Sequence, residues 1–247
     1  MTPGELAWSL PVVALGYLVL GITGFGSALV MVPLLAWRWP LAEVVPLVLL
    51  TDVVASALMG RLNWREVRWD VLRQLLPGMM LGALAGLLLQ RVSPGAWPLL
   101  ALGIYVVWVG RRAWRGVTGG GAAPPWLGHV HGLGVGLVQV MFGTAGPLVL
   151  AWMARRQIPA PAMRASTPAL MTVVAIGVLV LMAVDGRLGS PLLWQRLLWL
   201  LPMGVLAVLA GHAVAARLPV ALLRRAIAGL LMLSGLMLLV NAGRQIL

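Results

Sequence analysis

Two short glycine-rich segments interrupt the apolar runs of this chain, one in each half. The first extends from Gly21 to Ser27 and leads on to Pro33, and the second extends from Phe142 to Pro147. Unwound backbone survives in a bilayer only where it is buried in protein or lines a wet cavity, because lipid cannot satisfy its N–H and C=O groups. A broken apolar segment in both halves points to the binding site of a transporter. We therefore predict that these two segments form a substrate site.

The chemistry that suits these segments is anion binding. A helix N-terminus offers free N–H groups and a positive potential without a buried charged side chain. Glycine lets backbone approach a ligand closely, and threonine and serine hydroxyls add donors. The candidate substrate-binding residues here are Thr23, Gly24, Phe25, Gly26, Ser27, Gln139, Gly143, Thr144 and Gly146. The alternative is that small residues only let helices pack closely, which we favour for the segments Pro77–Gly86 and Pro202–Gly211.

Asp52 is the side chain with the most informative position. It lies in the middle of an apolar run, beside Thr51. A carboxylate at bilayer depth is costly unless it is paired, hydrated or protonated, which suits a group that loads and releases a proton. We predict a proton-coupling role, although a structural carboxylate bonded to an arginine or to helix-end N–H groups stays open. The second half has no matching acid, since the corresponding stretch reads Met171-Thr172-Val173.

Arginines stand at the mouths of the two broken runs. Arg38 follows the first, and Arg155, Arg156 and Arg164 follow the second. Because a guanidinium can grip an oxyanion with two parallel hydrogen bonds, we add Arg164 to the substrate-binding candidates. For any one of these arginines an ordinary place at the membrane interface is the stronger alternative. Arg38 could pair with Glu43.

The composition predicts an all-α integral membrane protein. Of 247 residues, 61% are apolar and 10% charged, and the mean hydropathy is +0.99. A span takes roughly 20 apolar residues, so the length allows roughly seven to nine spans. We predict about eight, in the apolar runs at about 10–36, 44–60, 75–90, 96–110, 129–154, 165–184, 197–216 and 219–241. The location is the cell (inner) membrane, with multiple passes.

The positive charge of the chain is explained by arginines at the membrane interface. Its net charge is +12, and all 18 basic residues are arginine. Arginines anchor spans at headgroups, so membrane lipid is the expected partner and nucleic acid is not. Counting the runs as alternating single crossings puts ten arginines on the side of the termini and eight opposite. That count leans towards cytoplasmic termini.

Matching intervals indicate two homologous repeats, each with a Gly/Pro-broken first helix. Gly24 precedes Pro46 by 22 residues, and Gly146 precedes Pro168 by 22. We assign residues 1–118 to the first transmembrane repeat, 119–127 to a Gly/Pro-rich linker, and 128–247 to the second transmembrane repeat.

The same motifs resemble those of a known family. Gly24-Phe25-Gly26-Ser27 with Pro33, and Gly143-Thr144-Ala145-Gly146-Pro147, are similar to the paired signatures of the TauE/SafE sulfite exporter family of 4-toluene sulfonate uptake permease-type membrane transporters. The proline-glycine segments Pro77–Gly86 and Pro202–Gly211 resemble its remaining pattern. The resemblance covers nearly the whole chain. It implies a secondary transporter of small anions, often sulfur-containing, such as sulfite and organosulfonates.

We therefore expect a secondary transporter of a sulfur-containing anion, proton-coupled, with alternating access between two repeats. The alternatives are another anion, such as a carboxylate or thiosulfate, and a passive anion channel. We do not expect an enzyme, because Asp52 and His212 lie on distant runs and form no catalytic cluster. No cofactor is expected, and no metal site either, because no acid cluster accompanies His129, His131 or His212. A homodimer stays open.

Overall fold

The protein is a bundle of helices. The computed structural model describes residues 2–62, 64–92, 97–115, 124–215 and 220–246, and these residues form helices and connecting turns without strands. The elements are α1 (Pro3–Thr23), α2 (Ser27–Leu35), α3 (Leu41–Leu62), η1 (Trp64–Glu66), α4 (Trp69–Val92), α5 (Trp97–Arg115), α6 (Leu127–Phe142), α7 (Gly146–Arg155), α8 (Ala160–Val184), α9 (Pro191–Val214) and α10 (Val220–Ile246).

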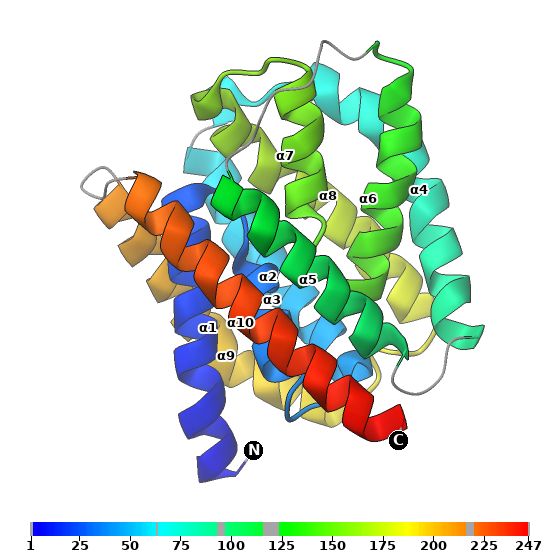
Figure 1. Cartoon of the computed structure of the whole chain (residues 1–247), viewed down its shortest axis with the longest axis vertical. Coiled ribbons are helices and arrows are strands. Elements are labelled where there is room, and N and C mark those ends of the chain that lie inside the picture. Colours follow the sequence, from blue (N-terminus) through cyan, green and yellow to red (C-terminus); the bar gives the residue numbers. More distant parts are fainter. Residues whose placement is uncertain (1, 63, 93–96, 116–123, 216–219, 247) are drawn as a thin grey trace.

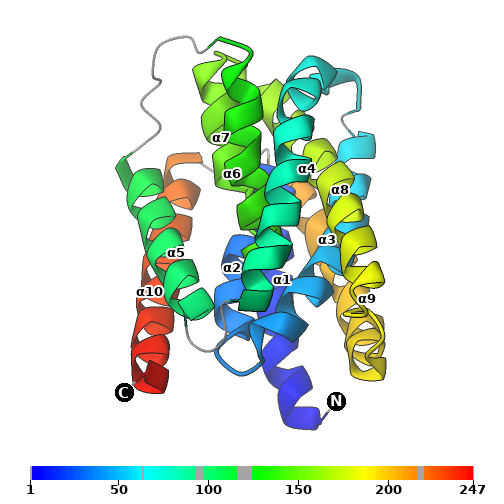
Figure 2. The ribbon, with the colours of Figure 1, turned by 90° about the vertical axis from the view of Figure 1, so that its right-hand side faces the viewer.

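Length and hydropathy make this a membrane protein. Five described helices are long and apolar enough to cross a bilayer: α1, α3, α4, α8 and α9. The expected all-α membrane class is therefore confirmed. Shorter apolar segments in α6 and α10 accompany them. Figures 1 and 2 show the helices running up and down the bundle, with both chain ends at the same end of it. We call this the termini end and the opposite one the far end.

Both glycine-broken runs fold back on themselves. Gly24 and Gly143 take left-handed conformations, with φ of 82° and 67°, and end α1 and α6. In the first run, α2 then returns beside α1, so that Gly16 packs against Met31. In the second, the His131 ring nitrogen Nε2 lies 2.8 Å from the Leu148 carbonyl oxygen of α7. We call α1–α2 the first hairpin, which opens at the termini end, and α6–α7 the second hairpin, which opens at the far end (Figure 2).

The fold-back changes the predicted topology. The runs at 10–36 and 129–154 are hairpins, whereas the sequence count treated each as one crossing. Each helix from α1 to α10 therefore reverses the direction of the one before it (Figure 1). The alternating count of ten arginines against eight is wrong for this reason, and the expectation of cytoplasmic termini loses its basis.

Glycines bring helices of the two halves into backbone contact. A Cβ on Gly21 of α1 would collide with the Val208 carbonyl of α9. In the same way, a Cβ on Gly78 or Gly82 of α4 would collide with carbonyls of α6. The fourth α-helix of each half thus packs against the hairpin of the other half. Close packing, favoured from the sequence for these proline-glycine segments, is confirmed.

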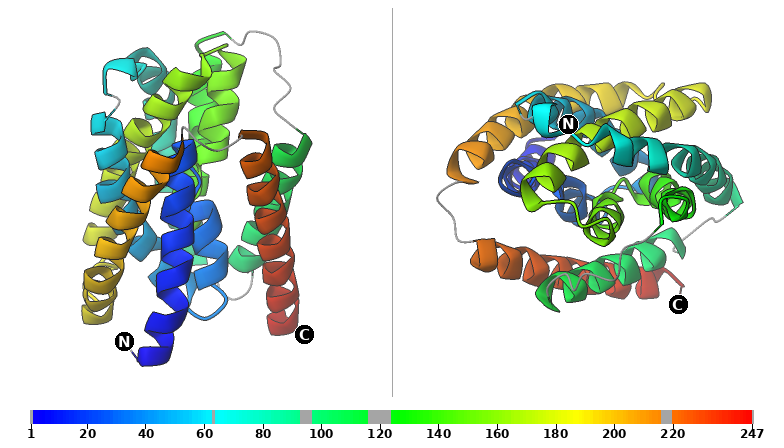
Figure 3. Two further views of the ribbon diagram at one scale, coloured as in Figure 1. Left: turned by 90° about the vertical axis from the view of Figure 1, so that its left-hand side faces the viewer. Right: turned by 90° about the horizontal axis from the view of Figure 1, so that it is seen from above.

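Two further pairs complete the bundle. Helix α3 packs against α8, and α5 packs against α10. Seen from above, α5 and α10 form a layer along one side of the other helices (Figure 3). The buried apolar side chains divide into two cores, one built largely around the first hairpin and one around the second. The space between the hairpins is therefore where the two cores meet.

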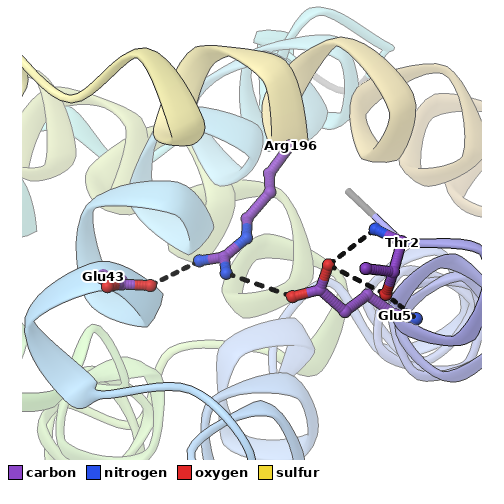
Figure 4. Close-up of polar contacts among 4 residues, drawn as sticks. All are labelled: Thr2, Glu5, Glu43 and Arg196. Carbon is purple, nitrogen blue, oxygen red and sulfur yellow. Dashed lines mark hydrogen bonds and ion pairs between the residues drawn. The ribbon is translucent and has the colours of Figure 1, made fainter.

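A buried arginine links three helices near the termini end (Figure 4). Arg196 of α9 donates from Nη1 to Glu43 of α3 at 2.5 Å, and its Nη2 lies 3.6 Å from Glu5 of α1. Its guanidinium also stacks 4.0 Å from the centre of the Trp39 ring. Because opposite charges and an aromatic face surround it, this buried cation is compensated.

The predicted pair of Arg38 and Glu43 is wrong. Glu43 accepts from Arg196 instead, while the Arg38 guanidinium lies 5.1 Å from the centre of the Trp8 ring. The sequence could not reveal this, because Arg196 is more than 150 positions from Glu43 and only the packing of α9 on α1 and α3 brings it there.

Candidate functional site

A pocket lies where the tips of the two hairpins meet. We call residues 24–26 the first tip and residues 143–145 the second tip. The pocket is lined by Leu20, Gly24, Phe25, Gly26, Ser27, Ala28, Leu29, Asp52, Ser56, Gly143, Thr144, Gly146, Pro147, Pro168 and Met171. Both tips, the N-termini of α2 and α7, and the middles of α3 and α8 thus share one cavity.

Local hydrogen bonds shape the first tip. Gly24 and Gly26 both have positive φ, 82° and 95°, which only glycine adopts without strain. The Thr23 hydroxyl oxygen lies 2.8 and 2.6 Å from the carbonyl oxygens of Val19 and Phe25, so its single proton is donated to one of the two. The turn is thereby closed by its own side chain, and α2 begins at Ser27 with its first N–H groups directed at the pocket. Those N–H groups have no partner within the helix.

The second tip is braced by a glutamine. The Ala145 N–H donates to Gln139 Oε1 at 3.0 Å, and the Tyr105 hydroxyl donates to the Thr144 carbonyl at 2.9 Å. The Thr144 hydroxyl has no hydrogen-bond partner, although the residue is only 2% exposed and lines the pocket. A buried polar group without a partner is costly, so this hydroxyl is a vacant donor.

Asp52 stands at the N-terminus of α2. The Ser27 hydroxyl donates to its Oδ1 at 2.8 Å. The Tyr17 hydroxyl faces the same carboxyl group but does not reach hydrogen-bonding geometry. Among the described residues, no arginine pairs with Asp52, so the arginine-bonded form of the structural alternative does not hold. The carboxyl group occupies the place at this helix N-terminus where an external anion would bind.

Most of the predicted site residues line the pocket in the structure, and three of them do not. Gly24, Phe25, Gly26, Ser27, Asp52, Gly143, Thr144 and Gly146 line the pocket. Thr23 and Gln139 support the tips from behind. Arg164 donates from Nη2 to the Gly21 carbonyl at 3.1 Å, so it caps the C-terminus of α1 and packs against Gly24 outside the lining.

Sequence reasoning missed several lining residues. Ser56 follows Asp52 by one helical turn, and the i, i+4 spacing could have identified it. Met171 lines the pocket from α8, and a methionine within an apolar run gave no chemical signal. Pro147 and Pro168 gave no separate chemical signal, because prolines are frequent throughout the chain.

The pocket is small. The volume available to the centres of water-sized molecules is about 20 Å³, enough for roughly one water. A substrate would therefore require the tips to separate. Two helix N-termini and hydroxyl groups surround the space, with Asp52 as its one acid. In the described part of the chain no three His, Cys, Asp or Glu side chains gather as a metal site would require.

These features define a multi-pass membrane protein with a central, polar pocket between two oppositely directed hairpins. The model of the family "Sulfite exporter TauE/SafE" matches residues 9–238, and the chain belongs to that family. It is also 41% identical over 193 residues to the "Probable inner membrane transporter protein TsaS" of Comamonas testosteroni, an alignment that covers 78% of this chain and 81% of the relative. No solved structure matches. The protein is thus a multi-pass membrane transporter rather than an enzyme.

Proposed function

We propose that this protein is a secondary transporter of a small sulfur-containing anion, sulfite or an organosulfonate, and that the pocket between the two tips is its binding site. Membership of the sulfite exporter family and similarity to TsaS support the class of substrate. The observation that carries the site is the vacant Thr144 hydroxyl, buried in a pocket with two helix N-termini and one carboxyl group.

The second tip supplies the donors in this proposal. The N-terminus of α7 is free of any acidic side chain, and the Thr144 hydroxyl beside it lacks a partner. An oxyanion has several acceptor oxygens, so it can accept from the hydroxyl and from a free backbone N–H together. Pro147 has no N–H, and the N–H groups of Leu148 and Val149 donate to the Ala145 carbonyl, so the free N–H at the start of α7 is that of Gly146.

In this proposal, Asp52 beside the first tip couples anion transport to protons. An ionised Asp52 places a negative charge in the pocket and repels a second anion. Protonation of Asp52 removes that charge, so the anionic substrate can enter. The loaded pocket then carries one proton together with one anion. Release of the substrate on the other side lets the proton leave. The absence of a counter-charge for Asp52 among the described residues favours this role over a fixed ion pair.

Alternating access requires the tips to separate, and the helix contacts suggest how. Residues 1–118 and 128–247 form the two proposed repeats, and their contacts are equivalent: α9 packs on α1 as α4 packs on α6. The moving units would then be α1, α2 and α9 against α4, α6 and α7. This differs from rocking the two sequence halves against each other, because each unit contains a helix from the other half.

Flux into proteoliposomes tests the proposal. Uptake of sulfite, ethanesulfonate, thiosulfate and acetate is measured with and without an imposed pH gradient, for the native protein and for Asp52→Asn. We expect saturable flux of sulfite or ethanesulfonate that follows the gradient, with the response to the gradient lost in Asp52→Asn. Asp70→Asn is the matched control, because it removes a carboxylate that is half-exposed and lies far from the pocket.

The outcomes separate the alternatives. Flux that does not saturate and ignores the gradient would make the protein a channel. Preference for acetate or thiosulfate would keep the site and change the cargo. Gradient-driven flux that is unchanged in Asp52→Asn would overturn the coupling role alone, and the absence of flux for all four anions would overturn the assigned cargo.

A further inference from the structure

The arginines are distributed unequally between the two ends of the bundle. Because successive helices reverse direction, each arginine can be assigned from its place in its helix or turn. The far end carries twelve described arginines: Arg61, Arg65, Arg68, Arg73, Arg111, Arg112, Arg115, Arg155, Arg156, Arg164, Arg224 and Arg225. The termini end carries five: Arg38, Arg91, Arg187, Arg196 and Arg244. Arg217 lies outside the described residues.

Acidic residues do not offset the difference. The far end has two, Glu66 and Asp70, and the termini end has three, Glu5, Glu43 and Asp185. At the termini end, moreover, two of the five arginines are engaged inside the protein. Arg196 is buried between Glu5 and Glu43, and Arg187 pairs with Asp185 at 2.7 Å and donates to Gln90.

The far-end arginines are mostly on the surface. Nine of them are exposed: Arg61, Arg65, Arg68, Arg73, Arg111, Arg112, Arg115, Arg155 and Arg225. They lie at the ends of α3, α4, α5, α7 and α10 that point away from the termini end, and the ends of α5 and α10 lie lower along the bundle than that of α7 (Figure 2). Among arginines of the termini end whose side chains are described, only Arg38 and Arg244 are exposed. Exposed guanidinium groups are thus concentrated at the far end, and we call these nine arginines the arginine belt.

We propose that the far end faces the cytoplasm, where its arginine belt contacts the anionic headgroups of the inner leaflet, and that the termini end faces away from the cytoplasm. Arginine in short loops near span ends is retained on the cytoplasmic side, whereas acidic residues contribute little to orientation. Each arginine near an anionic leaflet adds to the electrostatic attraction. The inference rests on the charge distribution and the reversals of the chain, and it stands independently of the cargo and of Asp52.

The orientation assigns each hairpin to a side of the membrane. The first hairpin, with Asp52 beside its tip, enters from outside the cytoplasm, and the second enters from the cytoplasm. The ion pairs of Arg196 with Glu43 and Glu5 then lie at the outer end of the bundle (Figure 4).

Cysteine labelling tests the orientation, and the chain suits it because it contains no cysteine. Ser190→Cys places a thiol in the exposed turn before α9 at the termini end, where the native side chain makes no capping bond. Pro125→Cys places one in the exposed turn before α6 at the far end. Each variant, as a full chain in bacterial spheroplasts, is treated with a membrane-impermeant maleimide before and after permeabilisation.

We expect Ser190→Cys to react in intact spheroplasts and Pro125→Cys to react only after permeabilisation. The reverse pattern, or equal labelling of both before permeabilisation, would overturn the proposal. Fusions after Leu247 provide a second readout that needs no accessible thiol. Alkaline phosphatase should be active there and a fluorescent protein that matures only in the cytoplasm should stay dark, whereas a bright and phosphatase-inactive C-terminus would contradict the orientation.

Removing positive charge from the arginine belt tests whether these arginines determine the orientation of the protein in the membrane. Replacing Arg61, Arg65, Arg68 and Arg73 together by glutamine should lower the fraction of molecules in the proposed orientation, seen as partial labelling of Pro125→Cys in intact spheroplasts. A variant that keeps full orientation would show that these four arginines do not determine it. Arg38→Gln and Arg244→Gln at the termini end are the matched controls and should leave the labelling unchanged.

Discussion

The two hairpin tips have the same backbone plan but opposite electrostatic surroundings. In each, a left-handed glycine ends one helix, and a second helix begins three residues later with its N-terminus at the pocket. The first N-terminus already has a carboxyl group beside it, because Ser27 holds Asp52 there. At the second, the α8 residues that line the pocket are Pro168 and Met171 rather than an acid, and the nearby Thr144 hydroxyl is vacant.

This difference indicates how two similar repeats could divide the work of transport. A symmetric pocket with two free helix N-termini would bind an anion but would have no group to titrate. With one acid at one tip, the same pocket becomes sensitive to protons while the other tip keeps its donors for the substrate. The central claim is therefore that the first tip couples transport to protons and that the second tip binds the anion.

The largest effect is expected from adding a methyl group at the first tip. Gly24→Ala should leave little folded protein, because φ is +82° and the new Cβ would lie 2.7 Å from the Arg164 carbonyl oxygen. Gly146→Ala at the second tip should fold, since its nearest neighbour would be Phe25 Cβ at 3.6 Å. The amount of monodisperse protein in detergent is the measurement. Equal yields for both variants would show that the tight contact at the first tip is not required.

A second variant separates the effect of backbone strain at a positive φ from the effect of a steric clash. Gly26→Ala keeps the unfavourable positive φ of +95° but its Cβ would meet only Val19, at 3.5 Å. It should lower the free energy of unfolding by only about 1–2 kcal/mol, the cost of a left-handed conformation. A loss of folded protein as complete as that of Gly24→Ala would remove the distinction between the two glycines.

An intermediate effect is expected at the vacant hydroxyl. Thr144→Val should weaken anion binding by about tenfold or more, since a hydrogen bond to a charged group contributes about 1.5–3 kcal/mol. Stability should not fall, because the hydroxyl is unpartnered in the empty protein. Titration calorimetry and thermal unfolding measure the two quantities, and Thr144→Ser should restore the affinity. Unchanged affinity in Thr144→Val would place the substrate elsewhere.

A loss of stability comparable to that of Gly26→Ala is expected behind the second tip. Gln139→Leu removes the acceptor of the Ala145 N–H and should destabilise the protein by about 1–3 kcal/mol. The melting temperature should fall by a few degrees, with saturable transport retained in the protein that stays folded. If the variant instead abolished binding at full stability, Gln139 would contact the substrate directly, as the sequence first suggested.

The sequence predicted the ingredients of the pocket better than their arrangement. Glycine and proline in an apolar run are local signals, so the breaks near Gly24 and Gly143 could be located, as could the isolated acid Asp52. The reversal of the chain at each break could not, because it depends on φ at Gly24 and on the packing of α2 back onto α1. The arginine count failed for this reason. Arg164 matched the chemistry of an anion ligand, yet it bonds to the Gly21 carbonyl, a contact across 143 positions of sequence.

The most direct test of the division between the tips is proton uptake during binding. Ethanesulfonate, which does not titrate near neutral pH, is added to the detergent-solubilised protein in weak buffer over a series of pH values, with a pH indicator and a parallel binding measurement. We predict that proton uptake approaches one per bound anion in the native protein and is absent in Asp52→Asn, while Thr144→Val binds more weakly but keeps the ratio. Uptake that persists in Asp52→Asn, or binding without uptake at every pH in the native protein, would contradict a coupling role for the first tip.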